Sequence, residues 1–297
     1  MSRATLRGWL MLAPALVIVG GLFGASLWYS VLQSLGYLPF IGQFQISLDA
    51  YRNLLPASGT PASREFLPAL GFTLWVSGAA TLLAAAGALG VVAVGLGSTR
   101  SPQAPRGIVP LLNLTLAFPH LVWAVAITLL LAQSGFIARV LFLLGIITTP
   151  ADFPVLIRDP YGIGIIISYT TKLIPFLLLM LLATLHAQTD DYAAAAATLG
   201  ASRWQTLRYV TLPLVLPALT AGMLLGFGFV FGAYEVPALL GVQFPRMLAV
   251  LALDFFRNAD LRSRAEGMAI SVLTGAIVLL VAAVAYALTA RRTAGHG

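Results

Sequence analysis

Two ionisable residues lie within long apolar stretches, where a charged group is costly and is therefore a candidate for function. Lys172 is the only lysine of the chain, and Glu235 lies in GAYEVPALLG at residues 232–241. The proline and glycines of that stretch predict a helix that bends or unwinds there. We predict a path or gate through a membrane formed by Lys172, Phe231, Tyr234, Glu235 and Pro237. Helix packing, or for Lys172 a structural cation held by carbonyls or an acid, is the alternative.

Residue types that carry out catalysis are sparse and scattered. His120, His186 and His296 lie far apart, and the sequence has no His-x-x-x-His pair and no G-x-S-x-G motif. The absence of cysteine excludes thiolate catalysis and zinc-thiolate sites. A P-loop needs G-x-x-x-x-G-K-[ST], whereas Lys172 follows SYTT. We therefore expect a chain that is not an enzyme and that binds no metal and no cofactor of its own.

The composition is that of an integral membrane protein. Hydrophobic residues make up 59% of the chain, charged residues only 9%, and the mean hydropathy is +0.93, whereas soluble domains carry roughly 25% charged residues. The basic residues behind the formal charge of +7 are scattered around the ends of apolar segments, which argues against nucleic acid as a partner. Six apolar segments are long enough to cross a bilayer: residues 9–35, 67–97, 107–132, 161–186, 212–241 and 267–290.

The connections between these segments are short or irregular. The apolar patch at residues 136–147 has about half the length needed to cross, and Arg139 interrupts it, so it predicts an interfacial or re-entrant segment. Residues 36–65 contain several prolines and glycines and predict an external connection with a short helix near residues 49–55. No separate soluble domain fits, and we predict one all-α membrane domain over residues 1–297.

The arginines give only a partial indication of orientation. They divide evenly between the two sides, but Arg100 and Arg106 share one short loop and Arg291 and Arg292 directly follow the last span. Charges in such positions weigh most in the positive-inside rule. We therefore expect both termini in the cytoplasm.

A semi-polar interruption between two apolar spans, at residues 192–217, reads YAAAAATLGASRWQTLRYVTLPLVLP. The alanine run favours a helix, Gly200 permits a sharp break, and an amphipathic pattern resumes after it. Leu212 and Pro213 then begin the next apolar span. This pattern predicts a helix, a turn and a second helix at a membrane surface.

The interruption resembles the cytoplasmic coupling loop of ABC importer permeases, whose pattern is E-A-A, three residues, Gly, nine residues, Ile, any residue, Leu, Pro. Six residues fall on that spacing: Ala195, Ala196, Gly200, Val210, Leu212 and Pro213. Ala194 stands where the family has Glu, and Asp190 or Asp191 just upstream is the candidate substitute. The stretch around Glu235 looks like that of the spermidine/putrescine, ferric iron and phosphonate permease subgroup.

The resemblance covers roughly residues 65–290 and implies the type I ABC importer permease architecture, in a bacterial or archaeal inner membrane. It implies a coupling loop at residues 188–211 that docks on an ABC ATPase dimer, which would bind the ATP and Mg²⁺. A second permease subunit, the same or homologous, and an extracytoplasmic substrate-binding protein would complete the importer. The expected coupling residues are Asp191, Ala194, Ala195, Ala196, Gly200, Ala201, Arg203, Trp204, Arg208, Val210, Leu212 and Pro213.

Two other functions fit the same composition. In an ion- or proton-coupled secondary transporter, Lys172 and Glu235 would serve the ion cycle and the loop would merely connect helices. A membrane scaffold without transport would need only a defined partner surface. Sequence alone names no substrate, because polyamine, ferric iron, phosphonate, sugar and other anions all remain open.

Overall fold

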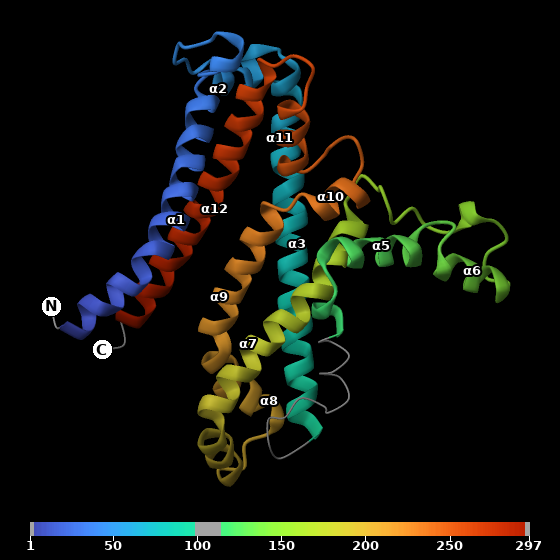
Figure 1. Cartoon of the computed structure of the whole chain (residues 1–297). Coiled ribbons are helices and arrows are strands. Elements are labelled where there is room, and N and C mark those ends of the chain that lie inside the picture. The colour runs from blue at the N-terminus through green and yellow to red at the C-terminus, as the bar shows by residue number, and fades with distance from the viewer. Residues whose placement is uncertain (1–2, 99–113, 295–297) are drawn as a thin grey trace. The chain divides into compact units, whose positions relative to one another are not determined.

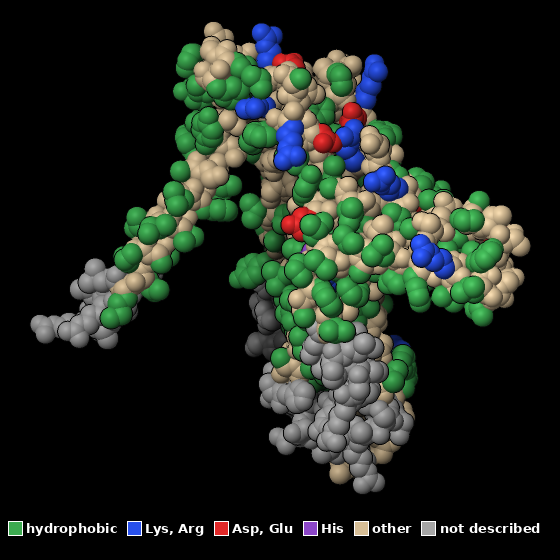
Figure 2. Space-filling view, turned by 45° about the vertical axis from the view of Figure 1, so that its right-hand side comes forward, with side chains coloured by type: hydrophobic (Ala, Val, Ile, Leu, Met, Phe, Trp, Pro, Cys, Tyr) green, Lys and Arg blue, Asp and Glu red, His purple; other side chains and the backbone are tan. Residues whose placement is uncertain are grey.

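The computed structural model describes residues 3–98 and 114–294, and within these ranges six helical segments are long and apolar enough to cross a membrane. The described surface agrees with a bilayer environment, because hydrophobic side chains cover much of it and charged ones are few (Figure 2). The predicted all-α membrane fold is therefore confirmed. The chain divides into two compact units, residues 1–67 with 251–276 and residues 68–250 with 277–297. This division follows internal contacts and does not test the prediction of one domain.

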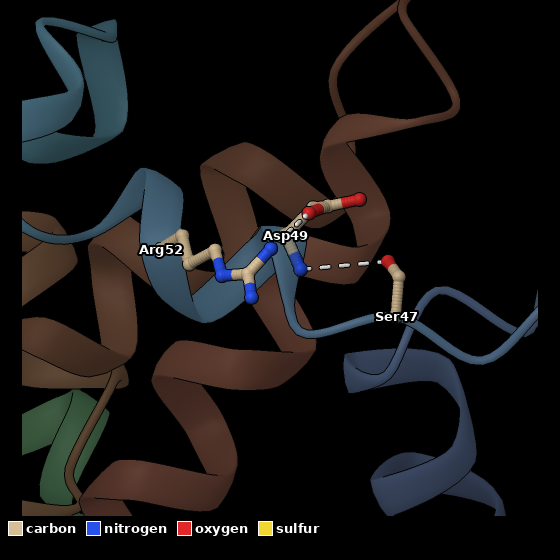
Figure 3. A network of polar contacts seen from close by, with 3 residues as sticks. All are labelled: Ser47, Asp49 and Arg52. Carbon is tan, nitrogen blue, oxygen red and sulfur yellow. Dashed lines mark hydrogen bonds and ion pairs between the residues drawn. The ribbon is translucent and has the colours of Figure 1, made fainter.

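The first unit holds α1 (Arg3–Ser34), α2 (Asp49–Asn53), the second half of α11 (Leu248–Phe256) and the first half of α12 (Ser263–Ala294) (Figure 1). Helix α2 confirms the predicted short helix near residues 49–55. The amide of Asn53 donates to the Glu266 carboxylate at 2.8 Å and ties α2 to α12. A polar cluster at the start of α2 is exposed: Arg52 pairs with Asp49 at 3.4 Å, and Ser47 accepts the Asp49 N–H (Figure 3). Such an exposed pair contributes little to stability.

The second unit is built on three long helices: α3 (Pro61–Ser98, from residue 68 onward), α7 (Ile163–Thr198) and α9 (Leu212–Phe231) (Figure 1). Residues of α3, α7 and α9 share one buried apolar cluster. Small residues allow the close approach that van der Waals packing in a bilayer needs. A Cβ at Gly222 of α9 would come within 2.7 Å of Leu177, and one at Gly226 within 3.1 Å of Leu173. This glycine pair therefore allows α9 to approach α7 closely.

The shorter helices of this unit follow breaks in the chain. Residues 107–113 of the predicted span at 107–132 lie outside the described residues. Helix α5 (His120–Leu131) and α6 (Phe136–Leu143) together make the third candidate span, which therefore includes much of the patch at 136–147 that was predicted to be separate. The fifth span ends at Phe231, short of the predicted residue 241, because residues 232–234 are not helical and α10 (Glu235–Leu240) begins after them. The predicted unwinding next to Glu235 is confirmed.

We predict that Gly222→Leu lowers the melting temperature of the detergent-purified protein, because the new side chain must displace Leu177 and Met180 from the α7–α9 contact. Overpacking of this kind costs roughly 1–3 kcal/mol. Thermal unfolding followed by intrinsic fluorescence measures the change. Gly24→Leu is the matched control, since nothing lies within 4 Å of a Cβ built there. Equal melting temperatures for the two variants would contradict the packing argument.

Candidate functional site

Two sites emerge from the predicted residues, and the first is the turn between α7 and α9. Helix α7 continues without interruption from its apolar span to Thr198, so the alanine run forms its last turns. Gly200 follows with φ +73°. The N–H groups of Leu199 and Ala201 donate to the carbonyls of Ala195 and Ala196 at 3.2 and 3.0 Å. The αL glycine and these bonds close the helix end as a Schellman-type cap.

The next helix begins at once with a cap of its own. The Ser202 N–H donates to the Gln205 side-chain oxygen at 2.7 Å, and the Gln205 N–H donates to the Ser202 hydroxyl at 3.3 Å. This reciprocal pair is a capping box. Helix α8 (Arg203–Thr206) therefore starts three residues after Gly200. The chain reverses within a turn whose polar backbone groups are satisfied on both sides, which gives it a defined shape.

A π-helical segment, Leu207–Thr211, joins α8 to α9. Pro213 follows it and has no N–H to donate to the carbonyl four residues earlier, so the regular helical bonding pattern is broken there. The Leu212 N–H instead donates to the carbonyl of Leu207, five residues back. Leu212 and Pro213 therefore mark a change of helix type as well as the start of the apolar span.

Large apolar side chains are exposed around this turn. Leu199 is 87% exposed, Trp204 65% and Tyr209 70%, and the Arg208 guanidinium lies 5.8 Å from the centre of the Tyr209 ring. Leu199 and Tyr209 were not among the predicted coupling residues, although an apolar residue beside a turn glycine is a signal that sequence reading could use. The structure places the backbone of Asp191, Ala194 and Arg203 in helices, while their side chains lie outside the described residues.

The second site is a cavity of about 290 Å³ in the second unit, and Lys172 lines it. Three segments contribute: α7 supplies Tyr169, Lys172 and Phe176 from one helix face, α9 supplies Phe229, and the start of α5 supplies His120. The His120 ring lies 4.7 Å from that of Phe229, whose ring centre is 6.2 Å from that of Tyr169. Spacings of three and four residues place the α7 side chains on the same side.

The Lys172 ammonium donates to the backbone carbonyl of Phe118, which precedes α5. Residues 118 and 119 are not helical, and Pro119 is the N-cap of α5, so this carbonyl is outside the helical bonding pattern. Within the described residues no ion pair joins Lys172 to Glu235. Lys172 instead has the carbonyl partner that was its structural alternative.

Neighbouring contacts hold this carbonyl in place. The Trp123 indole N–H donates to the Thr171 hydroxyl at 2.9 Å. The Trp123 ring stacks on the Phe118 ring, with 6.4 Å between the two ring centres. Pro175 cannot donate to the Thr171 carbonyl, which accepts the Thr115 hydroxyl at 3.5 Å instead. The segment before α5 is thereby attached to α7 beside Lys172.

The other predicted path residues are not brought into the cavity. Phe231 is fully buried and stacks on Phe227 with ring centres 5.5 Å apart, and Pro237 is buried in α10. Tyr234 and Glu235 are exposed at the start of α10. Their predicted roles in a path or gate stay predictions.

The fold and the turn define a helical, multi-span membrane protein, and comparison with known proteins gives its family. The family described as "Binding-protein-dependent transport system inner membrane component" matches residues 90–295. The chain belongs to this family. It is thus a multi-pass protein of the inner membrane, as predicted.

Individual relatives are distant and differ in what they carry. The inner membrane ABC transporter permease protein YnjC of Escherichia coli is 31% identical over 169 residues, 57% of this chain and 30% of YnjC. The sulfate transport system permease protein CysT of E. coli is 28% identical over 190 residues, 63% of this chain and 65% of CysT. The spermidine/putrescine transport system permease protein PotB of Salmonella typhimurium is 30% identical over 141 residues, 46% of this chain and 47% of PotB. The chain spans less than half the length of the first curated relatives it matches.

A solved structure has the same fold over nearly the whole chain. A chain of a bacterial ABC transporter involved in the import of the acidic polysaccharide alginate matches with a TM-score of 0.70 at 17% identity. The match covers 96% of this chain and 99% of that one. This similarity confirms the predicted permease architecture and leaves the substrate undetermined.

We predict that Gly200→Val loosens the turn, because a β-branched residue at φ +73° is strained by about 1–2 kcal/mol. Chymotrypsin cleavage at Trp204 and Tyr209 in the purified protein should become faster. Gly200→Asn is the control, because Asn tolerates αL and nothing lies within 4 Å of a Cβ at this position. Cleavage at the same rate in both variants would show that the backbone conformation does not maintain the turn.

Proposed function

We propose that this chain is the permease subunit of an ABC importer, which forms the substrate path and couples it to ATP hydrolysis on a separate subunit. The observation that carries the proposal is the turn at Gly200. It presents exposed Leu199, Trp204 and Tyr209 on a backbone capped from both sides, directly at the end of a helix that also lines the cavity. A rigid apolar projection fits a groove on a partner protein.

The proposed partner at this turn is an ABC ATPase dimer. The sequence of this chain carries no P-loop, so ATP and Mg²⁺ would be bound by that partner. Docking would place the coupling loop, residues 188–211, on the cytoplasmic side, and both termini would then be cytoplasmic. The proposal includes Arg203 and Arg208 as polar contacts around the apolar projection.

Two further partners follow from the family. A second permease subunit, homologous or identical, would cover exposed helix surface. In the most apolar part of α1 no residue is buried, and in that of α12 only 17% of the residues are buried. An extracytoplasmic binding protein would deliver the substrate. In support, an alginate ABC transporter with the same fold was solved in complex with an alginate pentasaccharide-bound periplasmic protein.

The relatives support substrates of opposite charge. Similarity to PotB supports a polyamine, the finer assignment suggested by the stretch around Glu235. Similarity to CysT and to a molybdate/tungstate permease of Thermococcus kodakarensis supports an oxyanion. None of the relatives named here is an ion-coupled carrier, so they give no support to the secondary-transporter alternative.

We predict that Leu199→Asp reduces the ATPase recovered with the tagged chain from native membranes by on the order of tenfold, because a charge would replace an exposed apolar anchor. Mass spectrometry of the retained proteins provides the measurement. Leu55→Asp is the matched control, since Leu55 is also exposed but belongs to the predicted external connection. Undiminished ATPase recovery with Leu199→Asp would refute docking at this turn.

A further inference from the structure

The cavity beside Lys172 is lined by hydrogen-bond donors that the described part of the protein leaves without acceptors. Lys172 is 4% exposed and Tyr169 is 2% exposed, so both are largely removed from solvent. An ammonium has three donors, and the described residues supply one acceptor, the Phe118 carbonyl. The rings of His120 and Tyr169 contact the Phe229 ring, and among the described residues neither the imidazole nor the Tyr169 hydroxyl has a hydrogen-bond partner. Three groups that can donate therefore line one cavity.

A buried ammonium also needs a counter-charge, because a carbonyl dipole does not neutralise it. Glu235 is exposed at the start of α10 and does not line the cavity. Within the described residues no carboxylate lies in ion-pair contact with Lys172. Among the described residues, Lys172 therefore lines the cavity without a negatively charged partner.

The walls restrict what can supply that charge. Phe176 and Phe229 present aromatic surface, and Gly226 leaves room where any side chain would approach Leu173. A bare inorganic oxyanion would lose its hydration on every side, and on the sides that face the apolar walls it would gain no donor in exchange. A carboxylate, sulfonate or phosphonate with an apolar or ring-shaped body fits both the single cation and the aromatic walls.

From these observations we infer that the cavity is a transit site for an organic anion, with Lys172 as its counter-ion and with His120 and Tyr169 as additional donors. The inference rests on the proposed importer function and specifies its substrate class. It disfavours a cationic amine, because a like charge is repelled by Lys172 in a medium of low dielectric constant.

The natural absence of cysteine permits a direct test of the charge in this cavity. Phe176→Cys places one thiol a single helical turn from Lys172. In native membranes containing the assembled protein, this thiol is labelled with two methanethiosulfonates of similar size, one carrying a sulfonate and the other a trimethylammonium group. Each reaction forms a mixed disulfide and releases methanesulfinate. The quantity measured is the sulfonate rate divided by the ammonium rate.

We predict that Lys172→Met lowers this rate ratio by on the order of tenfold in the Phe176→Cys background, while Lys172→Arg preserves it. Glu235→Gln should leave the ratio unchanged or raise it, because it removes the nearby negative charge. Phe44→Cys, on the external connection, is the matched reporter: its ratio should be the same with Lys172 and with Met at position 172. Labelling of Phe44→Cys also shows that the Lys172→Met chain is present and folded in the membrane.

Occupancy is tested with two probes of equal size and opposite charge. Benzenesulfonate should protect the Phe176→Cys thiol from labelling, and phenyltrimethylammonium should not. A rate ratio that is insensitive to Lys172→Met, a thiol that reacts with neither reagent, or equal protection by both probes would overturn the inference.

ATPase recovery from the same membranes separates this inference from the importer function. If the ATPase is retained but the ratio does not respond to Lys172, the anion site is wrong and the importer stands. If no ATPase is retained but the ratio responds and benzenesulfonate protects, the anion site stands and the importer is wrong.

Discussion

The constraint on which this structure depends is that a bilayer offers no hydrogen bonds to the backbone, so every polar backbone group at membrane depth must find a partner inside the protein. Long helices meet this requirement by themselves. The informative places are those where the helices stop, at residues 118–119 and 232–234. The first break frees the Phe118 carbonyl, and Lys172 donates to it. A backbone group that would be costly in lipid thereby becomes the partner of a side chain that would be costly as well.

Proline extends the same principle to the helix interiors. Pro175 leaves the Thr171 carbonyl without its helical donor, and the Thr115 hydroxyl takes that place. Pro213 leaves the Tyr209 carbonyl without its α-helical donor, and the bonding before α9 changes to the π-helical pattern, in which the Leu212 N–H donates to the Leu207 carbonyl. At Pro175 the acceptor that the proline creates is used by a donor from the segment before α5, and this bond attaches that segment to α7.

Features that follow from local sequence were predictable from it. The six apolar spans, the turn at Gly200 and the unwinding beside Pro237 each depend on residues that are close together in the chain. The cavity could not be found in this way, because His120, Lys172 and Phe229 come from three segments and no spacing rule connects them. Leu199 and Tyr209 were missed for another reason. They are not positions of the family pattern, and their exposure follows from the shape of the turn, which the pattern does not describe.

Helix α7 connects the two sites in one continuous element. From Phe176 at the cavity to Thr198 before the turn it rises about 33 Å, at 1.5 Å per residue. Helix α9 returns from the turn to the cavity, and the π-helical segment Leu207–Thr211 that precedes it makes this connection less regular near the turn. In the proposed importer, a displacement of the coupling loop would therefore reach Lys172 mainly through α7. The glycine contacts with α9 would then determine whether the cavity wall moves with α7 or is left behind, because a helix pair in such close contact cannot separate without losing its packing.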